Sequence, residues 1–344
     1  MKKFASLLTL AAVLASCGQK DKTAETTSSS APAAQVQEVK SLLVYTGRKA
    51  KYAKPLFEAF KAETGIEIIA KEGKTAQLAA TLIKEGANSQ ADLFFAQDSA
   101  NLGSLSAAQL LAPLSKETLA KVDARYASPK GEWIGTSGRA RVLVYNKDLV
   151  KKEDLPKSML ELTAPKWAGK VAWAPKNASF QAHITAMTKK LGTAKTSQWL
   201  ATMVKNGAKV YPKNTPIVKA VNAGEVPVGL VNHYYFYKVT KDMKPEQIKS
   251  ANHFFADGDI GLFVNVSGLA VLKSSKKKEA AAKFVDFLLS KKGQELLRSE
   301  NFEYPLAAGV EAHSGLKALK EINPVQIDLG DLDKIKETQE LLKA

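Results

Sequence analysis

The 344-residue sequence is poor in the side chains that most often bind metals or perform catalysis. It contains one cysteine, Cys17, so no disulfide can form within a single chain. Its four histidines, His183, His233, His253 and His313, show neither metal-ligand spacing nor the spacing of a catalytic triad. No nucleophile and base can be assembled from the remaining motifs, and we therefore expect a binding protein, not an enzyme.

Long apolar runs are missing as well, apart from a short one at the beginning of the chain. Residues 4–16 are apolar but too few to span a bilayer, and Lys2 and Lys3 precede them, which is the layout of a secretory signal. The run ends in Leu14-Ala15-Ser16-Cys17, which resembles the lipobox of bacterial lipoproteins. We expect a signal peptide at 1–16 and lipidation of Cys17. The plainer alternative is a signal followed by an unused thiol.

Residues 17–40 have too little apolar surface to offset the entropy of ordering them. They are rich in Ser, Thr, Ala and Gln, and we expect a flexible linker between the lipid anchor and a folded body. The chain is therefore expected to be periplasmic and attached to a membrane through its lipid alone. Its formal net charge of +16 favours anionic ligands or acidic surfaces in this compartment, and no nucleic acid is expected.

Strand and helix patterns alternate at the beginning of the folded body. Short β-rich runs at 42–45, 66–69 and 92–96 are separated by stretches with helical spacing of apolar residues. This order predicts a parallel sheet flanked by helices, with ligands beyond the carboxyl ends of the strands. A body of about 300 residues exceeds the size of one growing core, so two lobes are expected.

A second series of strand patterns supports a second α/β lobe. Its runs lie at 141–145, 171–173 and 226–231, and a further strand is expected within 261–272. Helices are expected from 276 to 289 and from 293 to 299, where the chain is expected to return to the first lobe.

The most informative cluster is the run from Asn232 to Tyr237, where a strand that ends at Val231 meets a helix. Neighbouring residues in a regular helix point about 100° apart, so Tyr234 and Tyr235 could share one ligand only at an irregular junction of this kind. Ferric iron prefers anionic oxygen, and two phenolates would bind it tightly. The alternative roles for this aromatic cluster are core packing and a stacking platform for an organic ligand.

Six motifs resemble the bacterial ferric-iron-binding proteins of iron ABC importers. They are VYTGR at 44–48, ADLFFAQD at 91–98, GTSGRARVLVYN at 135–146, APKNASFQA at 174–182, VPVGLVNHYY at 226–235 and EYPL at 303–306. The resemblance implies an α/β, two-lobed periplasmic binding protein fold of the clamshell type (type II), with each lobe a sheet flanked by helices. It also implies that iron is captured between the lobes and delivered to a membrane permease powered by an ATPase.

The resemblance further implies a set of site residues. Tyr234 and Tyr235 match the phenolate ligands of Fe(III). The positions that match a site for a synergistic anion, carbonate or phosphate, are Arg48, Asn177, Ser179, Asn214 and Asn232.

The sequence departs from the family in the first lobe. Members with a His and a Glu ligand have them where this chain has Lys49 and Gln97, and a third tyrosine of other members matches the region of Phe180. Additional ligands could therefore be Asp98, Gln97 or Tyr52. The competing interpretations are a helix cap for Asp98, which is favoured, and ordinary packing for Tyr52.

We assign 41–138 and 262–310 to the N-lobe and 139–261 and 311–344 to the C-lobe, and expect a monomer. The main alternative function is binding of a small anion or an organic ligand without metal, such as a phosphonate, a polyamine or a thiamine-like compound. An exported hydrolase and a surface interaction protein are the alternatives from other classes.

Overall fold

The computed structural model describes residues 39–332 and 334–343. The expected signal peptide, nearly all of the expected linker, and Cys17 lie outside the described residues. The strands are β1 (Ser41–Thr46), β2 (Glu67–Glu72), β3 (Leu93–Ala96), β4 (Ile134–Asn146), β5 (Val171–Trp173), β6 (Lys209–Val210), β7 (Val228–Asn232), β8 (Ser250–His253), β9 (Val264–Val271) and β10 (Tyr304–Pro305).

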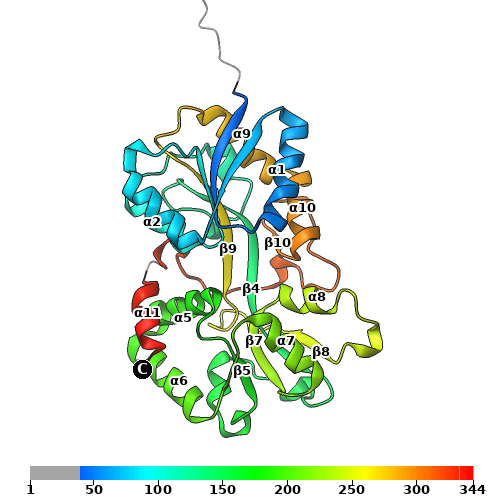
Figure 1. The fold of residues 1–344 in the computed structure, drawn as a ribbon. Helices are drawn as coiled ribbons and strands as arrows, with labels where there is room; N and C mark the ends of the chain where they lie inside the picture. Colours follow the sequence, from blue (N-terminus) through cyan, green and yellow to red (C-terminus); the bar gives the residue numbers. More distant parts are fainter. Residues whose placement is uncertain (1–38, 333, 344) are drawn as a thin grey trace, which may run out of the picture. The chain divides into compact units, whose positions relative to one another are not determined.

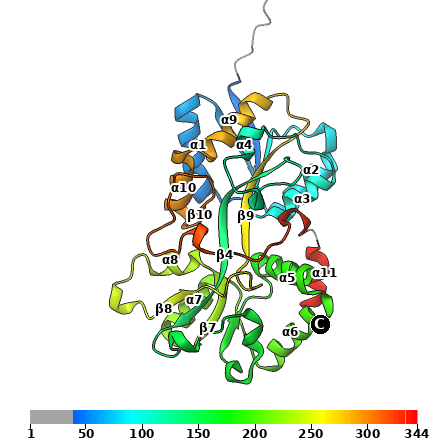
Figure 2. The same ribbon diagram turned by 180° about the vertical axis from the view of Figure 1, so that it is seen from behind.

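The first lobe contains the parallel β-strands that the alternating pattern predicted. Strands β2, β1 and β3 are parallel neighbours, and β9 extends the sheet antiparallel to β3. Every residue of β3 is buried, because helices cover both faces of the sheet. Helix α1 (Ala50–Thr64) and helix α2 (Thr75–Glu85) lie on opposite sides of this sheet in both views (Figures 1 and 2).

The second lobe has its own sheet, again as predicted. Strand β7 pairs antiparallel with β4 and parallel with β5, β6 follows β5, and β8 pairs with β4. Aromatic side chains fill its core, where Trp173 contacts Phe180 and Trp199 edge to face at centroid distances of 5.6 and 6.2 Å.

Strand β4 belongs to both sheets. Its residues 134–140 pair with β9, and its residues 141–145 pair with β7 (Figure 1). The change of partner falls between Ala140 and Arg141, so side chains around this point come close to both lobes. The two-lobed α/β fold is therefore confirmed, while the residue boundaries assigned to the lobes stay a prediction.

Helices α1, α2, α5 and α7 each end at a glycine. Gly65, for example, takes the left-handed conformation with φ 73° and closes α1. None of the described helices has both the length and the apolar character of a membrane span. The helices besides α1 and α2 are α3 (Ser99–Ala107), α4 (Lys116–Leu119), α5 (Ala178–Leu191), α6 (Thr193–Lys205), α7 (Asn214–Ala223), α8 (Tyr234–Thr240), α9 (Lys278–Leu288), α10 (Lys291–Asn301) and α11 (Ile335–Leu341).

The end of the chain contacts both lobes. The turn at 329–331 packs against α3, and the carbonyl oxygen of Gly330 lies so close to Gly103 that no Cβ atom would fit there. Helix α11 then lies beside α5, where the hydroxyls of Thr185 and Thr338 are 2.7 Å apart (Figure 2). The last segment therefore contacts a helix of each lobe, α3 and α5.

Candidate functional site

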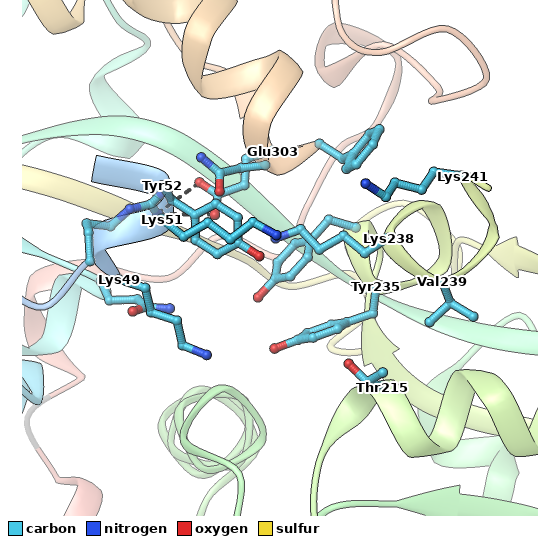
Figure 3. Close-up of a pocket in the computed structure, with 14 residues that line it drawn as sticks. Lys49, Lys51, Tyr52, Thr215, Tyr235, Lys238, Val239, Lys241 and Glu303 are labelled. Atoms are coloured by element: carbon cyan, nitrogen blue, oxygen red, sulfur yellow. Dashed lines mark hydrogen bonds and ion pairs between the residues drawn. The ribbon is translucent and has the colours of Figure 1, made fainter. Parts of the chain in front are cut away.

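A pocket of about 330 Å³ opens where the β1–α1 junction, helix α8 and the end of α10 come together. Residues 48–52 supply one wall, residues 234–241 the opposite wall, and residues 301–303 a third side. Figure 3 shows side chains from these segments extending into the same space. The pocket is thus lined by segments that follow strands of both sheets, β1 and β7.

A buried histidine fixes the junction that carries the tyrosine pair. The backbone N–H of Ala140 donates to Nδ1 of His233 at 3.1 Å, so Nε2 carries the proton and donates to the carbonyl oxygen of Phe302 at 2.9 Å. Burial lowers the pKa of His233 to about 4, and the ring therefore stays neutral near neutral pH. His233 joins β4, α8 and the end of α10, and it serves as structural support, not as a ligand.

Tyr234 and Tyr235 lie side by side at the start of α8. Their ring centroids are 4.5 Å apart with an interplanar angle of 33°. Tyr234 is only 6% exposed, and its hydroxyl accepts a hydrogen bond from Nδ2 of Asn232 at 3.3 Å. Burial raises the pKa of the Tyr235 phenol, and the neighbouring Tyr234 raises it further. In the absence of a strong positive charge, Tyr235 therefore remains protonated.

Tyr52 approaches this pair from helix α1, and Lys238 lies between them. The ammonium group of Lys238 is 4.1 Å from the ring centroid of Tyr52 and 4.7 Å from that of Tyr234. Burial lowers the pKa of Lys238 to about 8, with Arg48, Lys51 and Lys49 acting in the same direction against the opposing effect of Glu303. Figure 3 shows Tyr52 and Tyr235 extending toward each other from opposite walls.

Arg48 does line the pocket, but its charge is already paired. Its Nη1 lies 3.1 Å from both carboxylate oxygens of Glu303, and the hydroxyl of Ser137 also donates to that carboxylate. Burial alone would raise the pKa of Glu303, yet the charges of Arg48 and Arg139 and the other surrounding groups bring it below its usual value. The arginine expected to contact an anion is thus held by an internal carboxylate.

The other first-lobe candidates are divided between the pocket and a helix cap. Gln97 lines the pocket, and its backbone carbonyl accepts a hydrogen bond from Arg139. Asp98 accepts hydrogen bonds from the backbone and side-chain N–H groups of Asn101 at 3.2 and 2.7 Å. The favoured interpretation of Asp98 as the cap of α3 is confirmed. The carboxylate that lines the pocket is Glu303.

The asparagines expected around an anion fall into two separate groups. Oδ1 of Asn177 accepts from the N–H and the hydroxyl of Ser179 and caps α5, and neither residue lines the pocket. Asn214 and Asn232 are both buried, and their side-chain oxygens accept hydrogen bonds from Arg141 at 3.5 and 3.2 Å. The second group is connected to Tyr234 through Asn232, whose amide nitrogen also donates to that hydroxyl.

The uncharged and acidic polar side chains of the pocket, which are the ones able to ligate a cation, offer oxygen atoms. Within the described residues, no group of three or more His, Cys, Asp or Glu side chains could hold a metal ion. A metal would therefore depend on the phenol oxygens of Tyr52, Tyr234 and Tyr235, with Glu303 and the Gln97 amide as further oxygen atoms. Such a set suits a hard, highly charged cation.

Sequence reasoning missed Glu303, Lys238 and Arg141. Glu303 was inside a quoted motif, but its partner Arg48 is 255 positions away, so no local pattern pointed to the pair. Lys238 is four residues after Tyr234 and thus on the same helix face, which is a signal that the sequence does contain.

Comparisons with known proteins agree with this arrangement. A family model described as "Bacterial extracellular solute-binding protein" matches residues 88–334. The "Fe(3+)-binding periplasmic protein" of Serratia marcescens is 34% identical over 304 residues, which are 88% of this chain and 90% of that protein. The "Major ferric iron-binding protein" of Neisseria meningitidis is 34% identical over 83% of this chain and 87% of its own length.

Solved structures extend the likeness to the fold. Iron-bound HitA from Pseudomonas aeruginosa is 37% identical with a TM-score of 0.80, covering 89% of this chain and 99% of its own. A Trichodesmium protein (IdiA, FutA) in complex with iron and citrate is 31% identical with a TM-score of 0.77, covering 88% and 98%. The resemblance inferred from the sequence motifs is therefore confirmed, and these relatives are binding proteins, as expected, not enzymes.

Proposed function

Since the chain belongs to the family of bacterial extracellular solute-binding proteins, we propose that it is the ferric-iron-binding periplasmic component of an iron uptake system. The observation that carries this proposal is the pairing of Tyr234 and Tyr235 at the wall of a pocket between the two lobes. The names of the relatives support the same ligand.

Tyr234 and Tyr235 would bind Fe(III) as phenolates. Because burial raises the pKa of Tyr235, its proton leaves only when a metal compensates the negative charge. Iron binding should therefore release protons, and acidification should release iron, since the ligands must be deprotonated to bind.

Tyr52 is the best candidate for a ligand from the first lobe. It lines the pocket opposite the pair, whereas the carboxylate of Asp98 is engaged in capping α3. Gln97 would contribute at most a neutral amide oxygen. With Tyr52 as a ligand, iron would join α1 to α8 and hold the lobes together.

The basic side chains at the pocket favour an accompanying anion. Lys49, Lys51, Lys238 and Lys241 line it, and Glu303, whose carboxylate is paired with Arg48, is the one acidic residue among its described lining residues. A carbonate or phosphate bound with the iron would offset this positive charge. Asn214 and Asn232 stay in the proposal, because Asn232 donates to the hydroxyl of Tyr234 and Nδ2 of Asn214 has no hydrogen-bond partner among the described residues, whereas Asn177 and Ser179 are engaged in capping α5.

Export and delivery complete the proposal. A signal peptide at 1–16, lipidation of Cys17 and a linker at 17–40 would attach a monomeric body to a membrane in the periplasm. The family supports delivery of the ligand to an ABC permease and its ATPase.

The second candidate function is binding of a small anion without metal, and the same lysines favour it. Calorimetry with phosphate on metal-free protein distinguishes the two candidates. Strong phosphate binding that added ferric ion does not change would support the alternative.

Titration of metal-free protein with ferric citrate tests the main proposal. We expect a purple phenolate-to-iron absorption that is lost in Tyr234→Phe combined with Tyr235→Phe. Tyr145→Phe, which changes a tyrosine outside the pocket on β4, is the matched control and should retain the colour. Absence of colour in the wild type, or an undiminished band in the double variant, would contradict the proposal.

A further inference from the structure

Arg141 is a buried cation without an acidic partner. Its side chain is 2% exposed, and within the part of the chain that the structure describes no ion pair involves it. Nη1 donates to the two asparagine oxygens, while Nε and Nη2 have no hydrogen-bond partner among the described residues. A buried, unpaired charge is costly, so its retention calls for a compensating function.

The other buried arginines near the pocket show the contrast. Arg48 forms an ion pair with Glu303, and the charge of Arg139 also acts on that carboxylate. Arg141 lies on the same strand as Arg139 and two residues further along, past the point where β4 changes its partner from β9 to β7. Its backbone therefore pairs with the sheet of the second lobe.

The two tyrosines of the pocket wall are ionisable groups whose charge acts on Arg141. Desolvation lowers the pKa of Arg141 to about 10, and the charges of Tyr234 and Tyr235 would raise it. His183, which also senses the charge of Arg141, is itself neutral, because burial lowers its pKa to about 3. The phenol oxygens, once ionised, are therefore a source of negative charge for Arg141.

A chain of hydrogen bonds connects Arg141 to Tyr234. Nη1 of Arg141 donates to Oδ1 of Asn232 at 3.2 Å, which turns Nδ2 of the same amide toward the hydroxyl of Tyr234 at 3.3 Å. The amide orientation matters, because a phenolate oxygen accepts hydrogen bonds and needs a donor.

We propose that Arg141 is the fixed countercharge of the site, holding Asn232 as a donor to Tyr234 and balancing the negative charge of Tyr234 and Tyr235 when a ferric ion is bound. This inference rests on the proposed function and deepens it by adding a positioning residue that does not touch the metal. The cost of burying Arg141 in the metal-free protein would then be recovered when the phenolates form.

Three variants separate charge from structure. Arg141→Met removes the charge at similar length, Arg141→Lys retains it without the guanidinium donors, and Arg125→Met is a control at an exposed arginine paired with Asp123. Each is titrated with ferric citrate at fixed pH, and the melting temperature of the metal-free protein is measured in parallel.

We expect Arg141→Met to weaken ferric binding by at least about tenfold. The phenolate-to-iron band should move to longer wavelength, because without the nearby cation less energy is needed to transfer an electron from phenolate to iron. The metal-free protein should melt at the wild-type temperature or above it, since a costly buried charge is gone. Arg141→Lys should recover most of the affinity, and Arg125→Met should match the wild type.

Several results would overturn the inference. Unchanged affinity and an unmoved band in Arg141→Met would exclude a countercharge role, and the proposed function would survive. Weaker binding that comes with a lower melting temperature and no recovery in Arg141→Lys would reduce Arg141 to a structural residue. Should Arg141→Met fail to fold, Arg141→Gln removes the charge while keeping a donor toward Asn232, and the same readouts apply. A wild-type protein that binds no ferric ion would overturn both proposals.

Discussion

Arg48 and Glu303 form a buried ion pair with an Nη1–carboxylate distance of 3.1 Å, although 255 positions separate them in the chain. The pair joins the start of α1 to the segment after α10, and both segments line the pocket. It therefore fixes one wall of the site before any ligand arrives.

Removal of one member of this pair should lower the free energy of unfolding substantially. Glu303→Gln leaves the Arg48 guanidinium buried without a countercharge, and we expect a loss of about 3–5 kcal/mol in the free energy of unfolding. Equilibrium unfolding in urea measures it. Glu58→Gln, which breaks the exposed pair with Lys54, is the control and should cost no more than about 0.5 kcal/mol. Equal effects of the two variants would show that the buried pair contributes no more to stability than the exposed pair.

The same pair predicts a loss of stability in acid. The pKa of Glu303 is lowered in the folded protein from an ordinary value of 4.5, so the folded state favours the ionised carboxylate. Its contribution is complete above about pH 4.5 and is lost as the pH falls through the lower folded value. Unfolding free energies measured across this range should fall less steeply in Glu303→Gln than in the wild type. Parallel curves for the two proteins would be inconsistent with the pairing.

His233 should remain neutral well below the ordinary pKa of a histidine. Burial lowers its pKa from 6.5 to about 4, and its contribution to stability is therefore complete above pH 6.5 and is lost as the pH falls toward 4. An NMR titration of the imidazole resonances should place its midpoint near 4. A midpoint near 6.5 would mean that the ring is accessible to water and that it does not fix the junction before Tyr234.

Tyr52→Phe tests the contribution of the first lobe to iron binding. The loss of a metal ligand should weaken ferric binding by at least roughly tenfold, since even partners outside the coordination sphere contribute that much. The phenolate-to-iron band should also lose intensity while the Tyr234 and Tyr235 contribution persists. Calorimetric and spectroscopic titrations measure the two effects. Ferric binding equal to that of the wild type would show that Tyr52 packs in the pocket wall and is not a ligand.

Gly103→Ala tests the attachment of the chain's last segment. A Cβ atom at this position would lie 1.9 Å from the carbonyl oxygen of Gly330, and because that oxygen is backbone, the turn at 329–331 must shift. We expect a cost of about 1–3 kcal/mol in the free energy of unfolding. Gly169→Ala is the control without a steric clash, because a Cβ at Gly169 meets no atom within 4 Å. Its φ of 71° adds a backbone strain of about 1 kcal/mol, which is to be compared with the effect at Gly103. A stability equal to that of the wild type would show that the close approach is absent in solution.

Local patterns were sufficient for most of the strands and for the junction that carries the tyrosine pair, but they did not indicate β6, β8 or β10. The apolar runs that became β1, β3 and β7 are each complete within a few residues, and the strand-to-helix junction before Tyr234 follows from the end of β7. Asp98 was correctly interpreted because a helix cap depends on its immediate neighbours.

Features that depend on contacts between residues far apart in the sequence could not be predicted from local patterns. The ion pair of Arg48 with Glu303, and the position of Lys238 over the ring of Tyr52, arise only when the lobes are assembled. Likewise, the β-pattern around Arg141 predicted a strand but not its change of partner, and hence not that Arg141 would form no ion pair among the described residues.

The central claim is that the phenol oxygens of Tyr234 and Tyr235 bind the same ferric ion. A crystal of the iron-loaded protein, with anomalous diffraction recorded on both sides of the iron absorption edge, tests it most directly. We predict one iron peak within bonding distance of both phenol oxygens. A peak bonded to neither, or to only one of them, would contradict the account.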